Sequence, residues 1–251
     1  MPSSCEACRS GEDFPVPFTM AFQPILDVVE DRIWGYEALV RGTDGGGAAS
    51  VLSAVTDANR YVFDQACRVK AIELAGAGAL EPGTRLSINF MPNAVYEPRA
   101  CIRATLGAAA RTGFDPKRLM FEFTENERMS DAGHVANIVS EYRRMGFTTA
   151  LDDFGAGFAG LGLLAKFQPD LIKIDMDLLR GIDGSPARQA IVTGIVGIAG
   201  SLGITVLAEG VETAAELSCL RSAGIALFQG YFFARPQVET FQSMGDLRAA
   251  A

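Results

Sequence analysis

Two adjacent aspartates, Asp152 and Asp153, end an apolar run and begin a glycine-rich turn. The run is residues 148–151 and the turn is residues 154–157. Because a carboxylate is costly at the end of a buried strand unless a cation compensates it, this pair indicates a bound cation. The chemistry expected of such a site is that of metal ions held by oxygen ligands.

The same arrangement, a polar residue at the end of an apolar run, recurs along the chain. In order, these residues are Glu37, Asn89, Glu122, Asp152 with Asp153, Lys173 with Asp175, Glu209 with Glu212, and Gln229. Since successive side chains of a strand point to opposite faces, Glu122 points away from its neighbours Phe121 and Phe123. A single acid in a strand is ordinarily a surface residue, and a lysine there ordinarily reaches solvent. The recurrence at one end of successive strands instead favours a shared site.

The ligands available at these positions are carboxylates and one amide, without a cluster of histidines or thiolates. That set favours Mg²⁺ or Mn²⁺ over zinc or copper. The acids exceed what one octahedral ion needs, so we expect two ions bridged by a shared aspartate. Two such ions suit in-line attack on a phosphodiester. Lys173 would orient the attacking water or neutralise charge, and Arg41 would hold a phosphate oxygen.

The elements that must position these residues alternate between strands and helices. Strands are predicted at 18–28, 33–41, 85–91, 119–125, 148–154, 171–176, 204–209 and 226–233. Eight strands with helical crossovers predict a (β/α)₈ barrel, in which active sites collect where strands end. Only a few residues around 30–32 join the first two strands, too few for a parallel crossover. We therefore expect a modified TIM barrel whose first strand is antiparallel to the second.

Helical patterns fill the intervals between the strands. Residues 51–69 place apolar side chains on one face at helical spacing. Asp131 can cap a helix that runs to Arg144, and Ser185 precedes a first-turn proline in a helix that ends near Gly203. A further helix is expected within 213–224. No linker divides the chain, so we predict a tail at 1–15 and one domain at 16–251.

Composition restricts the function further. The chain has 251 residues, is 49% hydrophobic and carries a net charge of −8, which argues against binding a nucleic-acid polymer or an anionic membrane. Every apolar run is interrupted before it reaches membrane-spanning length, and no secretory signal is recognised. Five cysteines at scattered spacings favour reduced thiols and a cytoplasmic location. Cys5 and Cys8 lack the further ligands of a structural zinc site and are interpreted as thiols of the tail.

Residues 155–160 match the pattern G-x-G-x-x-G, with Asp175 near the spacing of a ribose-binding acid. A dinucleotide site is rejected because Asp152 and Asp153 would lie beside the pyrophosphate, and because the motif is not in a first βαβ unit.

Together these motifs resemble the EAL-domain phosphodiesterases that cleave cyclic di-GMP. The resemblance covers about Phe18 to Pro236. Its motifs are Gln23-Pro24-Ile25, Glu37-Ala38-Leu39-Val40-Arg41, Asn89, Glu122-Phe123-Thr124-Glu125, Asp152-Asp153-Phe154-Gly155, Lys173-Ile174-Asp175, Glu209-Gly210-Val211-Glu212 and Gln229-Gly230-Tyr231. The resemblance implies a metal-dependent hydrolase that converts cyclic di-GMP to linear pGpG, lowering the level of this bacterial second messenger, and it implies a homodimer.

The resemblance also implies a role for each residue of the site. One metal would be held by Glu37, Asn89, Glu122 and Asp152, and the second by Asp152, Asp153 and Glu209. Lys173 would contact the nucleophilic water, and Glu37 and Glu209 would be catalytic residues together with it. Gln23, Arg41, Glu212 and Gln229 would place the substrate, and Glu125 would anchor the loop after Asp153.

Two alternatives stay open at this point. The first is a catalytically silent cyclic di-GMP receptor or protein-interaction module, although the retained ligands count against it. The second is an unrelated barrel enzyme, such as an enolising one, which would need a Lys or His base and a site for a carboxylate substrate.

Overall fold

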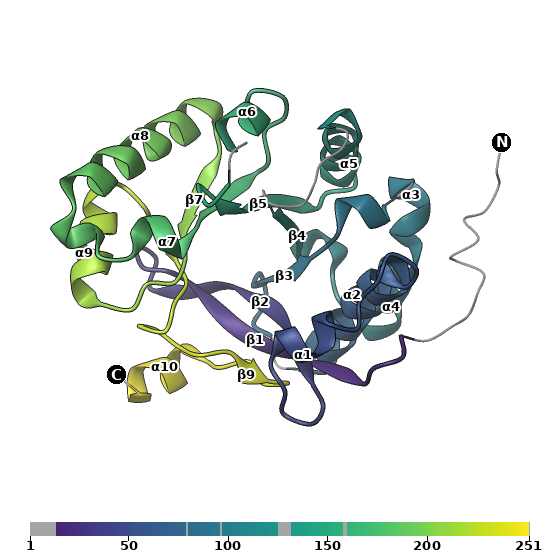
Figure 1. Cartoon of the computed structure of the whole chain (residues 1–251). Coiled ribbons are helices and arrows are strands. Elements are labelled where there is room, and N and C mark those ends of the chain that lie inside the picture. The colour runs from purple at the N-terminus through teal and green to yellow at the C-terminus, as the bar shows by residue number, and fades with distance from the viewer. Residues whose placement is uncertain (1–13, 79, 96, 125–131, 158–159, 251) are drawn as a thin grey trace.

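The computed structural model describes residues 14–250 except 79, 96, 125–131 and 158–159. Within this part of the chain, strands form one sheet that closes on itself, with helices on its outside (Figure 1). The strands are β1 Phe18–Asp27, β2 Arg32–Gly42, β3 Arg85–Asn89, β4 Leu119–Thr124, β5 Thr148–Phe154, β6 Leu171–Ile174, β7 Thr205–Ala208, β8 Leu227–Phe228 and β9 Gln237–Val238. The first eight make the barrel, and β9 pairs with β1 on the same edge as β8, nearer the start of the strand.

The first strand runs opposite to its neighbours, as the short connection predicts. β1 is antiparallel to β2 and to β8, whereas the pairs from β2–β3 to β7–β8 are parallel. The predicted modified TIM barrel is therefore confirmed. Because the strands from β2 onward are parallel, their carboxyl ends lie at the same rim.

The helices are α1 Ala48–Leu52, α2 Arg60–Ala77, α3 Pro98–Cys101, α4 Arg103–Thr112, α5 Ala132–Arg144, α6 Gly160–Leu164, α7 Met176–Leu179, α8 Pro186–Leu202, α9 Ala214–Ser222 and α10 Met244–Ala250. Short 3₁₀ turns lie at Pro92–Ala94, Pro116–Arg118 and Ile182–Gly184. None of the helices in the described residues is long and apolar enough to cross a bilayer.

The helical ends agree with the sequence signals in two cases. α8 begins at Pro186, where the Ser185 hydroxyl accepts a hydrogen bond from the Arg188 amide at 3.4 Å, and it ends before Gly203, which has φ of +70°. α5 ends at Arg144 as expected, and its predicted cap Asp131 lies outside the described residues, as do Cys5 and Cys8.

The continuous helix suggested by residues 51–69 is wrong. α1 ends at Leu52 and α2 starts at Arg60. Between them the Asn59 side chain accepts from the Thr56 amide at 2.7 Å and donates to the Ala54 carbonyl at 2.9 Å. An asparagine that bonds nearby backbone groups in this way competes with helical hydrogen bonding.

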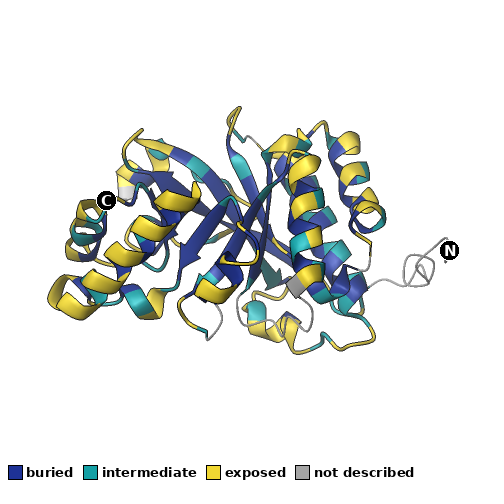
Figure 2. Cartoon of the chain, turned by 90° about the horizontal axis from the view of Figure 1, so that it is seen from above, coloured by how far each residue is buried: buried dark blue, intermediate teal, exposed yellow. Residues whose placement is uncertain are grey.

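Alternation along the strands separates two apolar layers. Aliphatic side chains and one methionine fill the barrel interior below the rim, namely Ile25, Met120, Ala150, Leu171, Leu207 and Leu227. Phe121, Phe123, Ile172 and Ile174 belong to the larger core between strands and helices. In Figure 2 the strands are mostly dark blue and the outer helix faces mostly yellow. Because side chains alternate along a strand, the polar residues between the Phe and Ile positions of the outer core point into the barrel.

The C-terminal segment covers the antiparallel pair, where no crossover helix lies. β9 pairs with β1 through Ala21 and Phe22, and the Phe241 ring lies 4.0 Å from the Phe22 ring between centroids. The sequence prediction contained neither β9 nor α10.

Candidate metal centre

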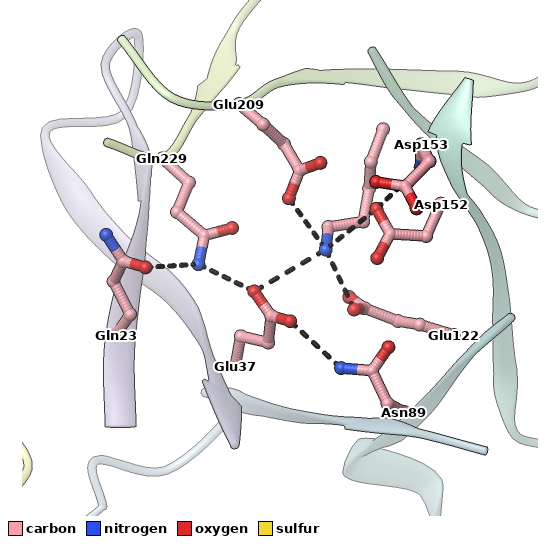
Figure 3. Close-up of polar contacts among 9 residues, drawn as sticks. Gln23, Glu37, Asn89, Glu122, Asp152, Asp153, Glu209 and Gln229 are labelled. Atoms are coloured by element: carbon pink, nitrogen blue, oxygen red, sulfur yellow. Dashed lines mark hydrogen bonds and ion pairs between the residues drawn. The ribbon is translucent and has the colours of Figure 1, made fainter. Parts of the chain in front are cut away.

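The Lys173 side chain, at the end of β6, lies at the centre of the rim. Its ammonium contacts Glu209 at 2.7 Å, Glu122 at 2.8 Å, Asp152 at 3.2 Å and Glu37 at 3.5 Å. Lys173 itself is fully buried. Figure 3 shows these carboxylates pointing toward one another from different strands. The convergence predicted from strand ends is therefore present.

Amides hold Glu37 in place from two sides. The Asn89 amide nitrogen donates to one carboxylate oxygen of Glu37 at 3.0 Å, and that of Gln229 donates to the other at 2.9 Å. Gln229 also donates to Gln23 at 3.2 Å, and Gln23 donates to the Ala234 carbonyl at 3.1 Å. Polar residues of β1, β2 and β3 and the glutamine that follows β8 thus form one chain of hydrogen bonds (Figure 3).

The end of β5, where the chain begins to turn, presents its two aspartates side by side. Asp153 has φ of +53°, and its amide donates to the Asp152 carboxylate at 2.9 Å. A left-handed conformation costs a non-glycine residue about 1–2 kcal/mol, although aspartate tolerates it better than most. The turn therefore keeps an unfavourable backbone geometry that brings both carboxylates to the rim.

The loops after β7 and β8 approach each other closely at Val211 and Gly230. A side-chain carbon on Gly230 would lie 2.1 Å from the Val211 carbonyl oxygen, so only glycine fits there. This contact places Gln229 next to the loop that carries Glu209 and Glu212.

One ammonium does not neutralise the carboxylates around it. Burial raises the pKa of Glu122 to about 8, opposed by Lys173 and reinforced by the charges of Glu37 and Asp152. Burial and the charge of Asp152 raise the pKa of Glu209 well above its usual value and that of Asp153 to about 6. Burial is the largest cause of these raised pKa values, and repulsion between the neighbouring carboxylates adds to it.

The carboxylates form two overlapping groups with the spacing of metal ligands. Glu37, Glu122 and Asp152 offer oxygens that lie within 4.8 Å of one another, and so do Asp152, Asp153 and Glu209. The Glu122 Oε1 atom is buried without a hydrogen-bond partner among the described residues. An acceptor left unpaired in this way, in an all-oxygen donor set, fits a divalent cation.

A cavity of about 290 Å³ opens beside the cluster. Its lining includes Gln23, Glu37, Asp152, Asp153, Glu209, Glu212 and Gln229, together with Met176 and Tyr231. A larger hollow of about 1000 Å³ begins on the other side of Leu39, reaches Asn89 and continues between β2, β3 and α2. The smaller cavity gives a bound molecule room beside the carboxylates, whereas Asn89 is the candidate ligand that lines the larger hollow.

Two predicted residues of the described part of the chain lie apart from the cluster. Glu212 is half-exposed and forms an ion pair with Arg180, with contacts of 2.5 and 2.9 Å. Arg41 donates to the Val40 carbonyl at 2.7 Å and joins no ion pair within the described part of the chain. Glu125 lies outside the described residues.

The sequence analysis missed the residues that support the loop after β7. Arg180 holds Glu212, and the buried Glu216 accepts from the backbone amides of Gly181, Glu212 and Thr213 at 2.9–3.2 Å. Thr213 and Glu216 have the spacing of a capping box, a sequence signal that could have identified Glu216. Nothing in the sequence indicates the partner of Arg180.

A sequence profile described as the EAL domain matches residues 16–236. The chain is 36% identical over 225 residues to the blue light- and temperature-regulated antirepressor BluF of Escherichia coli, covering 89% of this chain and 55% of that protein. It is 30% identical over 227 residues to the cyclic di-GMP phosphodiesterase PA2567 of Pseudomonas aeruginosa, covering 88% of this chain and 38% of that protein. The chain thus spans about half or less of these curated relatives.

Solved structures agree with the sequence relatives. A standalone EAL protein from Vibrio cholerae, bound to cyclic di-GMP, superposes with a TM-score of 0.88 at 51% identity, covering 91% of this chain and 96% of that one. Klebsiella pneumoniae BlrP1, in a complex with manganese and cyclic di-GMP, gives a TM-score of 0.84 at 37% identity over 92% of this chain and 58% of that one.

Proposed function

Because the chain belongs to the EAL domain family, we propose that it is a phosphodiesterase that hydrolyses cyclic di-GMP to linear pGpG. The observation that carries the proposal is the pair of carboxylate groups that overlap at Asp152 around Lys173. Relatives named for this activity or bound to this nucleotide support it. Hydrolysis would lower the concentration of a bacterial second messenger.

The residues of the rim fit two divalent cations of the Mg²⁺ or Mn²⁺ class. Glu37, Asn89, Glu122 and Asp152 would hold one ion, and Asp152, Asp153 and Glu209 the other. When bound, such ions lower the pKa of a water ligand and neutralise charge on a phosphoryl group. The negative cluster therefore needs them before it can accept an anionic substrate.

Lys173 supplies a fixed hydrogen-bond donor at the reacting atoms. Burial lowers the pKa of its ammonium, but the surrounding carboxylates outweigh burial and raise this pKa well above the usual value. Lys173 therefore stays protonated, so it orients the attacking water and stabilises negative charge, and does not act as a base. Glu37 and Glu209 contact the same ammonium from two sides and complete the catalytic group.

The remaining predicted residues would hold the nucleotide. Gln23, Gln229 and Glu212 line the smaller cavity and offer amide and carboxylate groups to a base or a ribose. Arg41 lies in the same strand as Glu37 and has a guanidinium without a carboxylate partner in the described residues, which suits a phosphate oxygen.

The proposal is tested by incubating the purified protein with cyclic di-GMP and Mg²⁺, Mn²⁺ or EDTA, and separating the products by chromatography. We expect pGpG with either metal and none with EDTA. Glu37→Gln should lose at least about 100-fold in turnover, whereas Glu30→Gln, at an exposed position, should match the wild type. Tight nucleotide binding without product in any metal would contradict hydrolysis and favour the silent receptor.

Three sequence predictions concern the protein as a whole: a homodimer, a cytoplasmic location, and a division into a tail at 1–15 and a domain at 16–251. They stay predictions. Light scattering after size exclusion measures the mass in solution, and a mass of one chain at micromolar concentration would contradict the dimer.

A further inference from the structure

An ion pair is buried behind the metal centre, between α2 and the outer faces of β3 and β4. Asp64 is 3% exposed and Arg68 is fully buried, and the Arg68 guanidinium contacts one oxygen of the Asp64 carboxylate. An apolar pair of similar volume is often as stable as a buried ion pair. Stability alone therefore does not explain why a buried ion pair occupies this position.

The other Asp64 oxygen bonds the chain just after a candidate ligand. It accepts a hydrogen bond from the Met91 amide at 2.9 Å, two residues beyond Asn89. The intervening Phe90 amide donates to the Glu122 carbonyl at 2.8 Å. The backbone that leaves Asn89 is thus attached on one side to β4 and on the other to Asp64, at the point where it turns into the 3₁₀ segment Pro92–Ala94.

Arg68 fixes the orientation of Asp64 from behind. Its guanidinium lies 5.9 Å from the centroid of the Phe90 ring and 5.8 Å from that of Phe121, and it donates to the Tyr142 hydroxyl at 3.3 Å. Phe90 follows Asn89, and Phe121 precedes Glu122. The ion pair therefore touches the sequence neighbours of two candidate ligands.

Asn89 is the most exposed of the candidate ligands. It is exposed, whereas Glu37, Glu122 and Asp152 are buried. An exposed side chain gains little order from packing, so the placement of the Asn89 amide follows from the backbone that carries it and from its hydrogen bond to Glu37. We propose that Asp64 is a positioning residue, which sets the place of the Asn89 amide among the metal ligands through its hydrogen bond to Met91. This inference rests on the proposed metal centre.

Two double variants isolate the hydrogen bond from the charge. One combines Asp64→Asn with Arg68→Met, and the other combines Asp64→Leu with Arg68→Met. Both remove the ion pair, but only the Asn variant keeps an oxygen that can accept the hydrogen bond from the Met91 amide. Calorimetry of Mn²⁺ binding should give an affinity within about threefold of wild type for the Asn variant. The Leu variant should bind about tenfold more weakly or worse, as is typical when a group that orients a metal ligand is removed.

A matched control uses the same exchange at the opposite end of β5. There Asp170 accepts from the Thr149 amide at 2.8 Å and pairs with Arg143 at 2.9 Å. Asp170→Asn and Asp170→Leu, each with Arg143→Met, should leave the Mn²⁺ affinity unchanged. This control separates positioning of a ligand from a general loss of stability.

A second measurement does not depend on affinity. Amide hydrogen exchange in a peptide spanning 86–95 of the metal-free protein should be faster than in wild type for the double variant with Asp64→Leu. It should not be faster for the double variant with Asp64→Asn. In an Asn89→Ala background the two double variants should bind Mn²⁺ equally, because the ligand that Asp64 positions is gone.

Equal Mn²⁺ affinities for the Asn and Leu variants, in a protein whose wild type binds Mn²⁺, would overturn this inference and leave the proposed function intact. A wild type that binds no Mn²⁺ would overturn the proposed function, and the inference with it. A loss of cyclic di-GMP affinity without metal, at unchanged Mn²⁺ affinity, would show that Asp64 acts on the nucleotide directly and would also overturn the inference.

Discussion

At the scale of single residues, the ammonium of Lys173 is the positive charge that faces four carboxylates at the rim. Lys173→Met should abolish measurable turnover. In EDTA it should also lower the free energy of unfolding by about 3 kcal/mol or more, because removal of one partner leaves buried charges uncompensated. Urea denaturation measures the second effect, and product separation measures the first.

Added Mn²⁺ should reduce the stability difference between Lys173→Met and wild type, since a cation that binds only the folded state stabilises it and replaces the missing charge. Lys166→Met, at an exposed position, is the control and should behave as wild type with and without metal. A Lys173→Met protein as stable as wild type in EDTA would show that the carboxylates do not need the ammonium.

At the scale of elements, the start of α9 connects two loops of the rim. Burial alone would raise the pKa of Glu216, but the amides of Gly181, Glu212 and Thr213 outweigh burial and lower that pKa. Glu216→Gln should lower the free energy of unfolding at pH 7 by about 2 kcal/mol, since a charged acceptor for three amides is lost.

The pH dependence of that difference has a definite sign. Because the folded pKa of Glu216 lies below the usual 4.5, its contribution is fully present above pH 4.5 and disappears as the pH falls through the folded value. Urea denaturation at pH 7 and below pH 4 should therefore show the two proteins converge in acid. Glu73→Gln, at an exposed ion pair with Arg111, should show little difference at either pH. A difference that grows in acid would contradict this account of the carboxylate.

The sequence predicted those elements whose signal is local. Glu122 between two phenylalanines indicated both a strand and the direction of its side chain, and Ser185 with Pro186 indicated where α8 begins. The last barrel strand was predicted at 226–233, but β8 ends at Phe228 because the chain turns at Gly230 to approach Val211. The supports of the site, Asp64 beneath Met91 and Arg180 beside Glu212, depend on segments distant in sequence, which no local pattern encodes.

At the scale of the whole molecule, the reversed first strand leaves a face that the C-terminal segment covers. The matched sequence profile ends at residue 236, yet the chain beyond it packs on β1 and β2. The Tyr36 hydroxyl donates to the Gln242 carbonyl at 2.6 Å, and Arg248 pairs with Asp31 in the turn between the two strands at 2.5 Å. This segment takes the place of the helix that a parallel crossover would have supplied.

Phe241 packs the segment against the aromatic rings of β1 and β2, so its removal tests whether the segment is part of the folded barrel. Its ring lies 4.0 Å from that of Phe22 and 5.1 Å from that of Tyr36, between centroids. Phe241→Ala should lower the free energy of unfolding by about 2 kcal/mol, less than a fully buried phenylalanine because the ring is partly exposed. Val238→Ala, at a residue 52% exposed in the same segment, should lower the free energy of unfolding much less.

Because the segment supports the barrel wall and contributes no ligand, Mn²⁺ affinity measured by calorimetry should change less than threefold in both variants. A Phe241→Ala protein that unfolds at the same urea concentration as wild type would show that the barrel is stable without this cover.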